Sequence, residues 1–330
     1  MKNFRKGGLS DEEIVQWLRG LRGNSYAPES NFSVAAVFRA RVQGVDDYYF
    51  GGVNVEIIDN RSATHAEEGC IAALVTGLGR QAEIVEGWVM GAPKGVNAGD
   101  PDPAADTLIS CCGKCRQQIA GLAGEDVKIH ALTLNGRRSS TTVGAFLPDL
   151  FTFRQYIPEL LAPKETGAPA PSSDEVRNRL IRQERQTEEE IFAWLRDLES
   201  LVYVSKVSQA LVLELDNGAY VAGAKIEEAA FISMNAAQSA VAVAVSAFGE
   251  RAIRGIRVYT KGVDGREIPA DSFGTLTLPA LQTLSEMAEH EKIPVRFFME
   301  GGDTVSMTLS GAAGAAPTYR KPFLQKSWRE

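Results

Sequence analysis

The amino-acid sequence contains the same pattern twice, and this repeat limits the folds open to the chain more than any other feature. SDEEIVQWLRGLRGNSY, from residue 10, aligns with TEEEIFAWLRDLESLVY, from residue 187. The offset of 177 pairs Trp17 with Trp194 and Tyr26 with Tyr203. At 330 residues the chain is also too long for a single small core. We therefore expect two domains built on one plan.

Each copy starts with a helix and continues with alternating strands. Ser10 and Glu13 form a Ser-x-x-Glu capping box, and Ile14, Trp17 and Leu21 follow at helical spacing. FSVAAVFRARV and YYFGGVNVEII then alternate like strands, and the second copy shows the same change of period. Helix, two strands, helix and strand in succession predict an α/β fold. We expect two tandem three-layer α/β/α domains with mixed central sheets and helices on both faces.

The second copy is shorter, and a linker precedes it. Gly-x-Asn-x-Glu at 52–56 aligns with Gly-x-Lys-x-Glu at 223–227 with an offset of 171, so the hairpin of the second copy has lost six residues. APKETGAPAPSSDE, which ends at residue 175, is too rich in Pro, Ala and Ser for a packed core. We expect domains over 1–161 and 187–330, joined by a linker and a solvated helix over 162–186.

Charge and cysteine usage narrow the class of protein. The chain carries 35 basic and 42 acidic side chains, a net charge of −7, which disfavours a nucleic-acid partner. We expect neither a secretory signal nor a membrane span, because the first residues lack an apolar core region and no apolar run approaches membrane length. All four cysteines lie before residue 116, and three of them fall within five positions. This grouping indicates a reduced, cytoplasmic protein with a thiolate site rather than a disulfide framework.

Three potential metal ligands fall at the starts of two predicted helices. His65 begins HAEEGCIAALVTGLG, and Cys112 and Cys115 begin the next helix. Helix starts that follow strands meet at one edge of an α/β sheet, so these side chains should converge. Three nitrogen and sulfur ligands with a fourth position left for water are typical of catalytic zinc. Positive helix N-termini also favour the thiolate form of cysteine.

Glu67 is the predicted acid and base of this site. It lies two residues after His65, so it reaches the water at the fourth position without binding the metal. There it would take the proton of the attacking water and pass protons to a ring nitrogen and to the departing amine. His-x-Glu followed by Cys-x-x-Cys is the pattern of zinc deaminases.

Other interpretations of these residues remain open. Cys112-x-x-Cys115 could be a redox pair, although redox chemistry does not require His-x-Glu. A structural zinc site would need a fourth ligand, and His130 lies inside an apolar strand as an expected core or edge residue. Cys70 is expected to pack in the core, and Cys111 to point away from the metal site.

At this point the sequence resembles the cytidine deaminase family, and in particular its two-domain homodimeric branch. The resemblance is carried by NFSVAAV, YFGGVNVE, HAEEGCIAAL, CGKCRQQI and FLPDLF in the first copy and by KIEEAAF in the second. It implies hydrolytic deamination of cytidine and deoxycytidine to the uridine forms, with release of ammonia and with Zn²⁺ as cofactor. It also implies a small nucleoside substrate and a homodimer.

The resemblance further implies roles for five residues outside the metal site. Asn54 and Glu56 would hold the ribose 3′-hydroxyl, and Phe32 would pack on the pyrimidine, although plain core packing is an equal alternative for Phe32. Ala230 and Phe231 would reach the pocket of the partner subunit.

Three departures from the family pattern leave the substrate open. Cys111 stands where a proline is usual, Ala35 stands where a glycine is usual, and residues 91–108 lengthen the stretch between the ligand motifs. We expect 91–108 to be a loop beside the site, which could admit a modified or larger amino-heterocycle. A third hypothesis is a polynucleotide-editing or zinc-stabilised binding module.

The second copy lacks the predicted chemistry. At the offset of 171, His65 aligns with Ala236 and Glu67 with Gln238, and no cysteine follows residue 115. The second copy is therefore predicted to hold no catalytic zinc and to pack against the first copy as a mimic of a second subunit.

Overall fold

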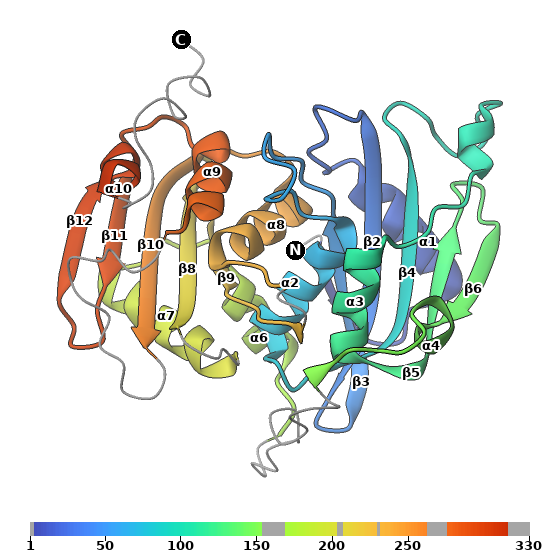
Figure 1. Cartoon of the computed structure of the whole chain (residues 1–330), viewed down its shortest axis with the longest axis horizontal. Coiled ribbons are helices and arrows are strands. Elements are labelled where there is room, and N and C mark those ends of the chain that lie inside the picture. Colours follow the sequence, from blue (N-terminus) through green and yellow to red (C-terminus); the bar gives the residue numbers. More distant parts are fainter. Residues whose placement is uncertain (1–2, 154–168, 203–206, 230–231, 263–275, 316–330) are drawn as a thin grey trace.

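The computed structural model describes residues 3–153, 169–202, 207–229, 232–262 and 276–315, which build two six-stranded sheets with helices between and outside them (Figure 1). The first copy contains β1 (Phe4–Lys6), α1 (Asp11–Arg22), β2 (Phe32–Val42), β3 (Val45–Val53), α2 (Ala66–Leu78), β4 (Glu83–Pro93), the 3-10 helix η1 (Pro103–Asp106), α3 (Gly113–Leu122), β5 (Ala123–Leu132), β6 (Arg138–Thr142) and α4 (Val143–Phe146).

The second part of the chain repeats this order. It contains α6 (Ser173–Leu180), β7 (Ile181–Arg182), α7 (Glu188–Leu201), β8 (Val207–Leu215), β9 (Tyr220–Ala224), α8 (Ala236–Phe248), β10 (Ile253–Gly262), α9 (Leu278–Met287), β11 (Pro294–Phe298), β12 (Thr304–Thr308) and α10 (Leu309–Ala315).

The two sheets match strand for strand. Their orders are β1-β3-β2-β4-β5-β6 and β7-β9-β8-β10-β11-β12. In each sheet one internal pair is parallel, β4 with β5 and β10 with β11, and the other pairs are antiparallel. The predicted α/β fold with two mixed sheets is confirmed.

Two adjacent glycines of β3 show how the layers of the first copy pack. A Cβ at Gly51 would lie 2.6 Å from Leu21 of α1, whereas a Cβ at Gly52 would lie 2.2 Å from the backbone of Ala66 in α2. Because successive strand residues face opposite sides of a sheet, α1 and α2 cover opposite faces. Gly223 of β9 meets the backbone of α8 in the same way, at 2.2 Å from Ala240.

Helices α2 and α8 lie side by side between the two sheets, at the centre of the molecule (Figure 1). Every residue of α2 is buried. Hydrogen bonds join the copies here: Asn24 Nδ2 donates to the Ser246 carbonyl at 2.9 Å, and the Val53 amide donates to Ser246 Oγ at 3.1 Å. A helix that is apolar on all sides needs such cover, so α2 depends on the second copy.

The helix predicted within 162–186 is present, but one of its faces is buried rather than solvated. The helix there, α6, starts at Ser173, with Ser172 and Glu175 forming its capping box, and Val176 and Leu180 are buried. Val176 and Leu180 are four residues apart and so share one face of the helix, and Val176 lies against α2 at Gly77. Residues 181–182 then form strand β7, the counterpart of β1.

None of the helices in the described part of the chain has the length and apolar character needed to cross a membrane.

Candidate metal centre

A cavity of about 520 Å³ opens where α2 and α3 begin. Its walls come from the ends of β2 and β3, from the loop before α2 and from the segment before α3. Among the lining residues are Ser30, Phe32, Asn54, Glu56, Thr64, His65, Glu67, Ile109, Ser110 and Cys112.

The three predicted metal ligands converge at this cavity. His65 is the N-cap of α2, Cys112 is the N-cap of α3, and Cys115 lies in the first turn of α3. The sulfurs of Cys112 and Cys115 each lie 3.3 Å from His65 Nδ1, and the three atoms fall within 4.8 Å of one another. No other group of three potential metal-binding side chains occurs among the described residues.

Electrostatics favour a thiolate in this cluster. Hydrogen bonds with Cys115 and His65 lower the pKa of Cys112 to about 3. The bond to Cys112 in turn raises the pKa of His65. In this cluster a thiolate lies next to two groups that carry protons. A divalent metal that binds here would take the place of those protons and release them.

Glu67 lines the same cavity as His65 and Cys112 and is only 5% exposed. Burial raises the pKa of its carboxyl group, because desolvation disfavours the charged form. The Cys111 thiol is hydrogen-bonded to this carboxylate. Cys111 thus stays out of the metal cluster but contacts the predicted acid and base, a contact that the sequence did not reveal.

Sequence reasoning missed the role of Glu68. Its Oε2 accepts the backbone amide of His65 at 2.9 Å, and its Oε1 pairs with Lys114 Nζ at 2.9 Å. One buried carboxylate thus joins the first turns of α2 and α3. An acidic residue three positions after a helix start was the signal that could have revealed it.

The proposed nucleoside-binding residues lie on the cavity wall and also hold the backbone. Asn54 Oδ1 accepts the Val34 amide at 2.8 Å, and its Nδ2 donates to the Phe32 carbonyl at 2.9 Å. Glu56 accepts the amides of Glu29 and Ser30 at 3.1 and 3.0 Å. Phe32 lines the cavity and is half-buried.

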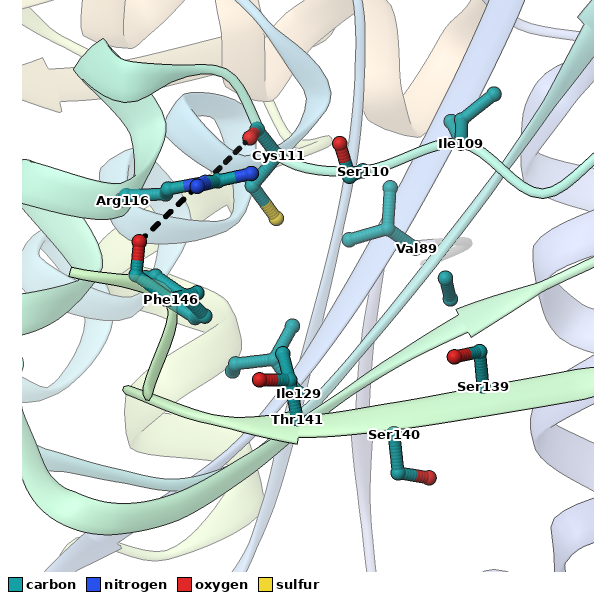
Figure 2. A pocket seen from close by; sticks show the side chains of 11 residues that line it. Val89, Ile109, Ser110, Cys111, Arg116, Ile129, Ser139, Ser140, Thr141 and Phe146 are labelled. Carbon is teal, nitrogen blue, oxygen red and sulfur yellow. Dashed lines mark hydrogen bonds between the residues drawn. The ribbon is translucent and has the colours of Figure 1, made fainter. Parts of the chain in front are cut away.

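A second, smaller cavity of about 120 Å³ lies next to the first (Figure 2). The two cavities share Ile109 and Ser110, and the Cys111 sulfur faces the second one. Arg116 closes one side of it by donating to the carbonyls of Cys111 and Phe146 at 2.8 and 3.0 Å.

Only the start of the expected loop lies beside the site, where Gly91 packs against Phe32 and Ile109. None of residues 91–108, all of which the structure describes, lines the larger cavity. The first part of this stretch extends β4, and its tip bonds to the β5–β6 turn through Gly99 and Asn135 at 2.7 Å. The β5–β6 turn thus holds the later part of the stretch away from the larger cavity.

The predicted alignment of the two sites is shifted by one residue. Asn235, and not Ala236, is the N-cap of α8, so it corresponds to His65, and Ala237 corresponds to Glu67. The shift arises because bridges pair Val55 with Thr64 but Ile226 with Met234, which leaves the second loop one residue shorter. The second copy still lacks the histidine ligand, the carboxyl group that would transfer protons, and both cysteine thiols.

The remaining predicted residues fall as follows. Cys70 is fully buried and its thiol contacts the Phe50 carbonyl at 3.4 Å, so it packs in the core. His130 is also buried, with Ser140 Oγ at 2.7 Å and Glu86 Oε1 at 3.0 Å. Ala230 and Phe231 lie outside the described residues.

Comparison with known proteins shows that the chain resembles cytidine deaminases. Two solved structures, the cytidine deaminases of Burkholderia pseudomallei and Mycobacterium leprae, are each 26% identical, with 43% of this chain aligned to 100% of theirs and TM-scores of 0.35 and 0.32. The enzyme from Mycobacterium tuberculosis is 21% identical over 44% of this chain and 98% of its own, with a TM-score of 0.32. No protein-family model and no curated protein matches the sequence.

Proposed function

We propose that this chain is a zinc-dependent hydrolytic deaminase that converts cytidine and deoxycytidine to the uridine forms. One observation carries the proposal: His65 Nδ1 and the sulfurs of Cys112 and Cys115 converge beside the buried Glu67 on the wall of a cavity large enough for a nucleoside. The three potential metal ligands, the carboxyl group that would transfer protons and a cavity for the substrate thus lie together.

The donor set fits zinc. Zn–S and Zn–N bonds of about 2.3 and 2.0–2.1 Å put sulfur and nitrogen about 3.6 Å apart in a tetrahedron. The two sulfur–nitrogen distances here are 3.3 Å, close to that value. When bound, zinc with three protein ligands lowers the pKa of a water molecule to about 7.

Glu67 would move the protons of the reaction. The water oxygen adds to the ring carbon that bears the amino group, and Glu67 takes the water proton. Glu67 passes this proton to the ring nitrogen, takes the second proton from the hydroxyl group formed by the addition, and passes it to the amine. The C–N bond then breaks, the hydroxyl oxygen becomes the carbonyl oxygen of the product, and ammonia departs. Burial raises the pKa of this carboxyl group, which makes it a better proton acceptor than an exposed carboxylate.

Asn54 and Glu56 would hold the sugar hydroxyl. An amide nitrogen carries two hydrogens, and the bond from Asn54 to Phe32 uses one of them. The second N–H and a lone pair of Glu56 are the donor and acceptor that one hydroxyl needs. Their backbone bonds fix both side chains before a ligand arrives.

A substrate panel tests the proposal. Ammonia release from cytidine, deoxycytidine, cytosine, adenosine, guanine and a blasticidin-like nucleoside should be fastest for the first two. Turnover of none of the six, together with binding of single-stranded nucleic acid, would favour a polynucleotide-editing or binding module instead.

The second cavity supports one other candidate, a deaminase for a modified or larger amino-heterocycle. Its walls are largely apolar, with Val89, Ile129 and Ala131 among them, and they include Cys111, whose thiol is hydrogen-bonded to Glu67. A methyl group next to the reacting carbon would be its natural occupant. Ala131→Leu fills this cavity, so it should lower kcat/KM for methylated cytidines about tenfold more than for cytidine. Equal effects on both substrates would exclude this candidate.

We further propose that two chains associate and that Ala230 and Phe231 help to close the partner's pocket. The burial of α2 under α8 supports a structural role for the second copy. Sedimentation of the full chain should show a dimer, and Phe231→Ala should raise KM for cytidine. A monomer with full activity would exclude the assembly.

A further inference from the structure

Arg80 connects both ligand-bearing helices to the second copy. It follows Gly79, the residue that ends α2, and its side chain is 4% exposed. Its guanidinium donates to Glu228 Oε2 at 3.0 Å and to the Gly121 carbonyl at 3.4 Å. Its backbone amide donates to the Leu201 carbonyl at 2.9 Å. Glu228 and Leu201 both belong to the second copy.

The Gly121 carbonyl lies in the last turn of α3, where backbone carbonyls lack partners within the helix. A cation at this end complements the negative end of the helix dipole. Glu228 comes so close to α3 that a Cβ at Gly121 would lie 2.2 Å from its Oε2. The contact therefore requires glycine at this position.

The same two helices carry the metal ligands at their other ends. His65 and Cys112 are their N-caps, and the ion pair between Glu68 and Lys114 joins their first turns. Helices of 13 and 10 residues place Arg80 about 15–20 Å from the cluster. Polar contacts thus join α2 and α3 at both ends. The contacts at the C-terminal ends include Glu228 of the second copy.

The contact between Arg80 and Glu228 requires these two residue types. Glu228 is 1% exposed, so loss of either partner leaves a buried charge without compensation. A planar guanidinium can donate in fixed directions to a carboxylate and a carbonyl at once, which a lysine ammonium does less well.

We propose that Arg80 and Glu228 form a clasp that sets the position of α3 relative to α2 and so fixes the spacing of His65, Cys112 and Cys115. Both are positioning residues, and the second copy acts on the metal site through them. The inference rests on the proposed zinc site, and it does not require that cytidine be the substrate.

Full-length Glu228→Gln tests the clasp, with Gly121→Ala as a second variant that displaces Glu228 and leaves its charge intact. In both variants we expect zinc transfer to a chelator to be about tenfold faster and the cobalt-substituted absorption spectrum to change. Where deamination is measurable, kcat should fall while KM for the nucleoside changes less than twofold.

Arg257→Gln is the matched control. It breaks the ion pairs that join Arg257 of β10 to Glu214 of β8 and to Glu188 of α7, at 2.8 and 3.1 Å, all within the second copy. It should lower the melting temperature without changing zinc release. The clasp is refuted if the Glu228 and Gly121 variants lose stability like this control but release zinc at the wild-type rate. If the Glu228 and Gly121 variants change zinc release and the cobalt spectrum as expected but the wild-type chain shows no deaminase activity, the proposed function fails and the clasp does not.

Discussion

His65 and Asn235 occupy the same place in the two copies, each as the N-cap of a buried helix of 13 residues. In each helix the residue three positions later, Glu68 or Gln238, accepts the backbone amide of the N-cap. The second copy has therefore kept the start of the helix and lost the metal ligand. Gln238 also donates to the Ser62 carbonyl at 3.1 Å, so this end of α8 now supports the loop before His65.

We predict one zinc ion per chain, bound in the first copy. Cys112→Ala and Cys115→Ala should each remove it, because two protein ligands remain in either variant. Cys70→Ala is the control, since this thiol packs in the core, and it should keep full zinc content. Metal analysis after gel filtration measures all three, and retained zinc in the two ligand variants would refute the site.

Much of the fold was predictable because its signals are local. Capping residues mark the starts of α1 and α7, alternation marks the strands, and the repeat requires two sheets of the same order. The strand β7 has only two residues, which is too short to show alternation, so it was missed. The ligands were found because each motif begins a helix.

Features that depend on distant parts of the chain were missed. Arg80 and Glu228 lie 148 residues apart, and although Glu228 belongs to KIEEAAF, no local pattern pairs it with Arg80. The one-residue shift between His65 and Asn235 arises in a loop, where repeat alignment gives no guidance. Bonds from residues 99 and 106 to the β5–β6 turn hold the later part of 91–108, and composition could not reveal them.

Replacement of Glu67 and Glu68 should separate proton transfer from structure. Glu67→Gln should retain zinc and lose about 10²–10⁴-fold in kcat, because glutamine cannot take the proton of the water. Glu68→Gln should lose far less, because glutamine can also accept the His65 amide, as Gln238 does for Asn235 in the second copy. Steady-state rates of the two variants decide the assignment, which fails if the losses are reversed or equal.

Glu56→Gln should weaken recognition of the sugar hydroxyl. We expect kcat/KM for cytidine to fall by about 10-fold or more, because a hydrogen-bonding partner of a bound hydroxyl is weakened. The same variant should have little effect on the 2′,3′-dideoxy analogue, which lacks that hydroxyl. An equal loss for both nucleosides would mean that Glu56 only orders residues 29 and 30.

Stability should fall in mild acid because of His130. Burial lowers the pKa of this histidine in the folded state, so below about pH 6.5 the unfolded chain binds the proton more tightly. The loss of stability caused by His130 is absent at higher pH and grows as the pH falls from 6.5 to the pKa of His130 in the folded state. His130 changes the free energy of unfolding by at most about 1.4 kcal/mol per pH unit. Urea unfolding at pH 5 to 8 should show a smaller acid loss for His130→Gln, and an unchanged loss would contradict this origin.

The most direct test of the central claim is to titrate zinc back into the metal-free full chain while following ammonia release from cytidine. We predict that activity rises linearly with zinc and stops rising at one zinc per chain, with no rise in the Cys115→Ala variant. Activity in the metal-free chain that added zinc does not increase, or an equal rise in the Cys115→Ala variant, would contradict the account.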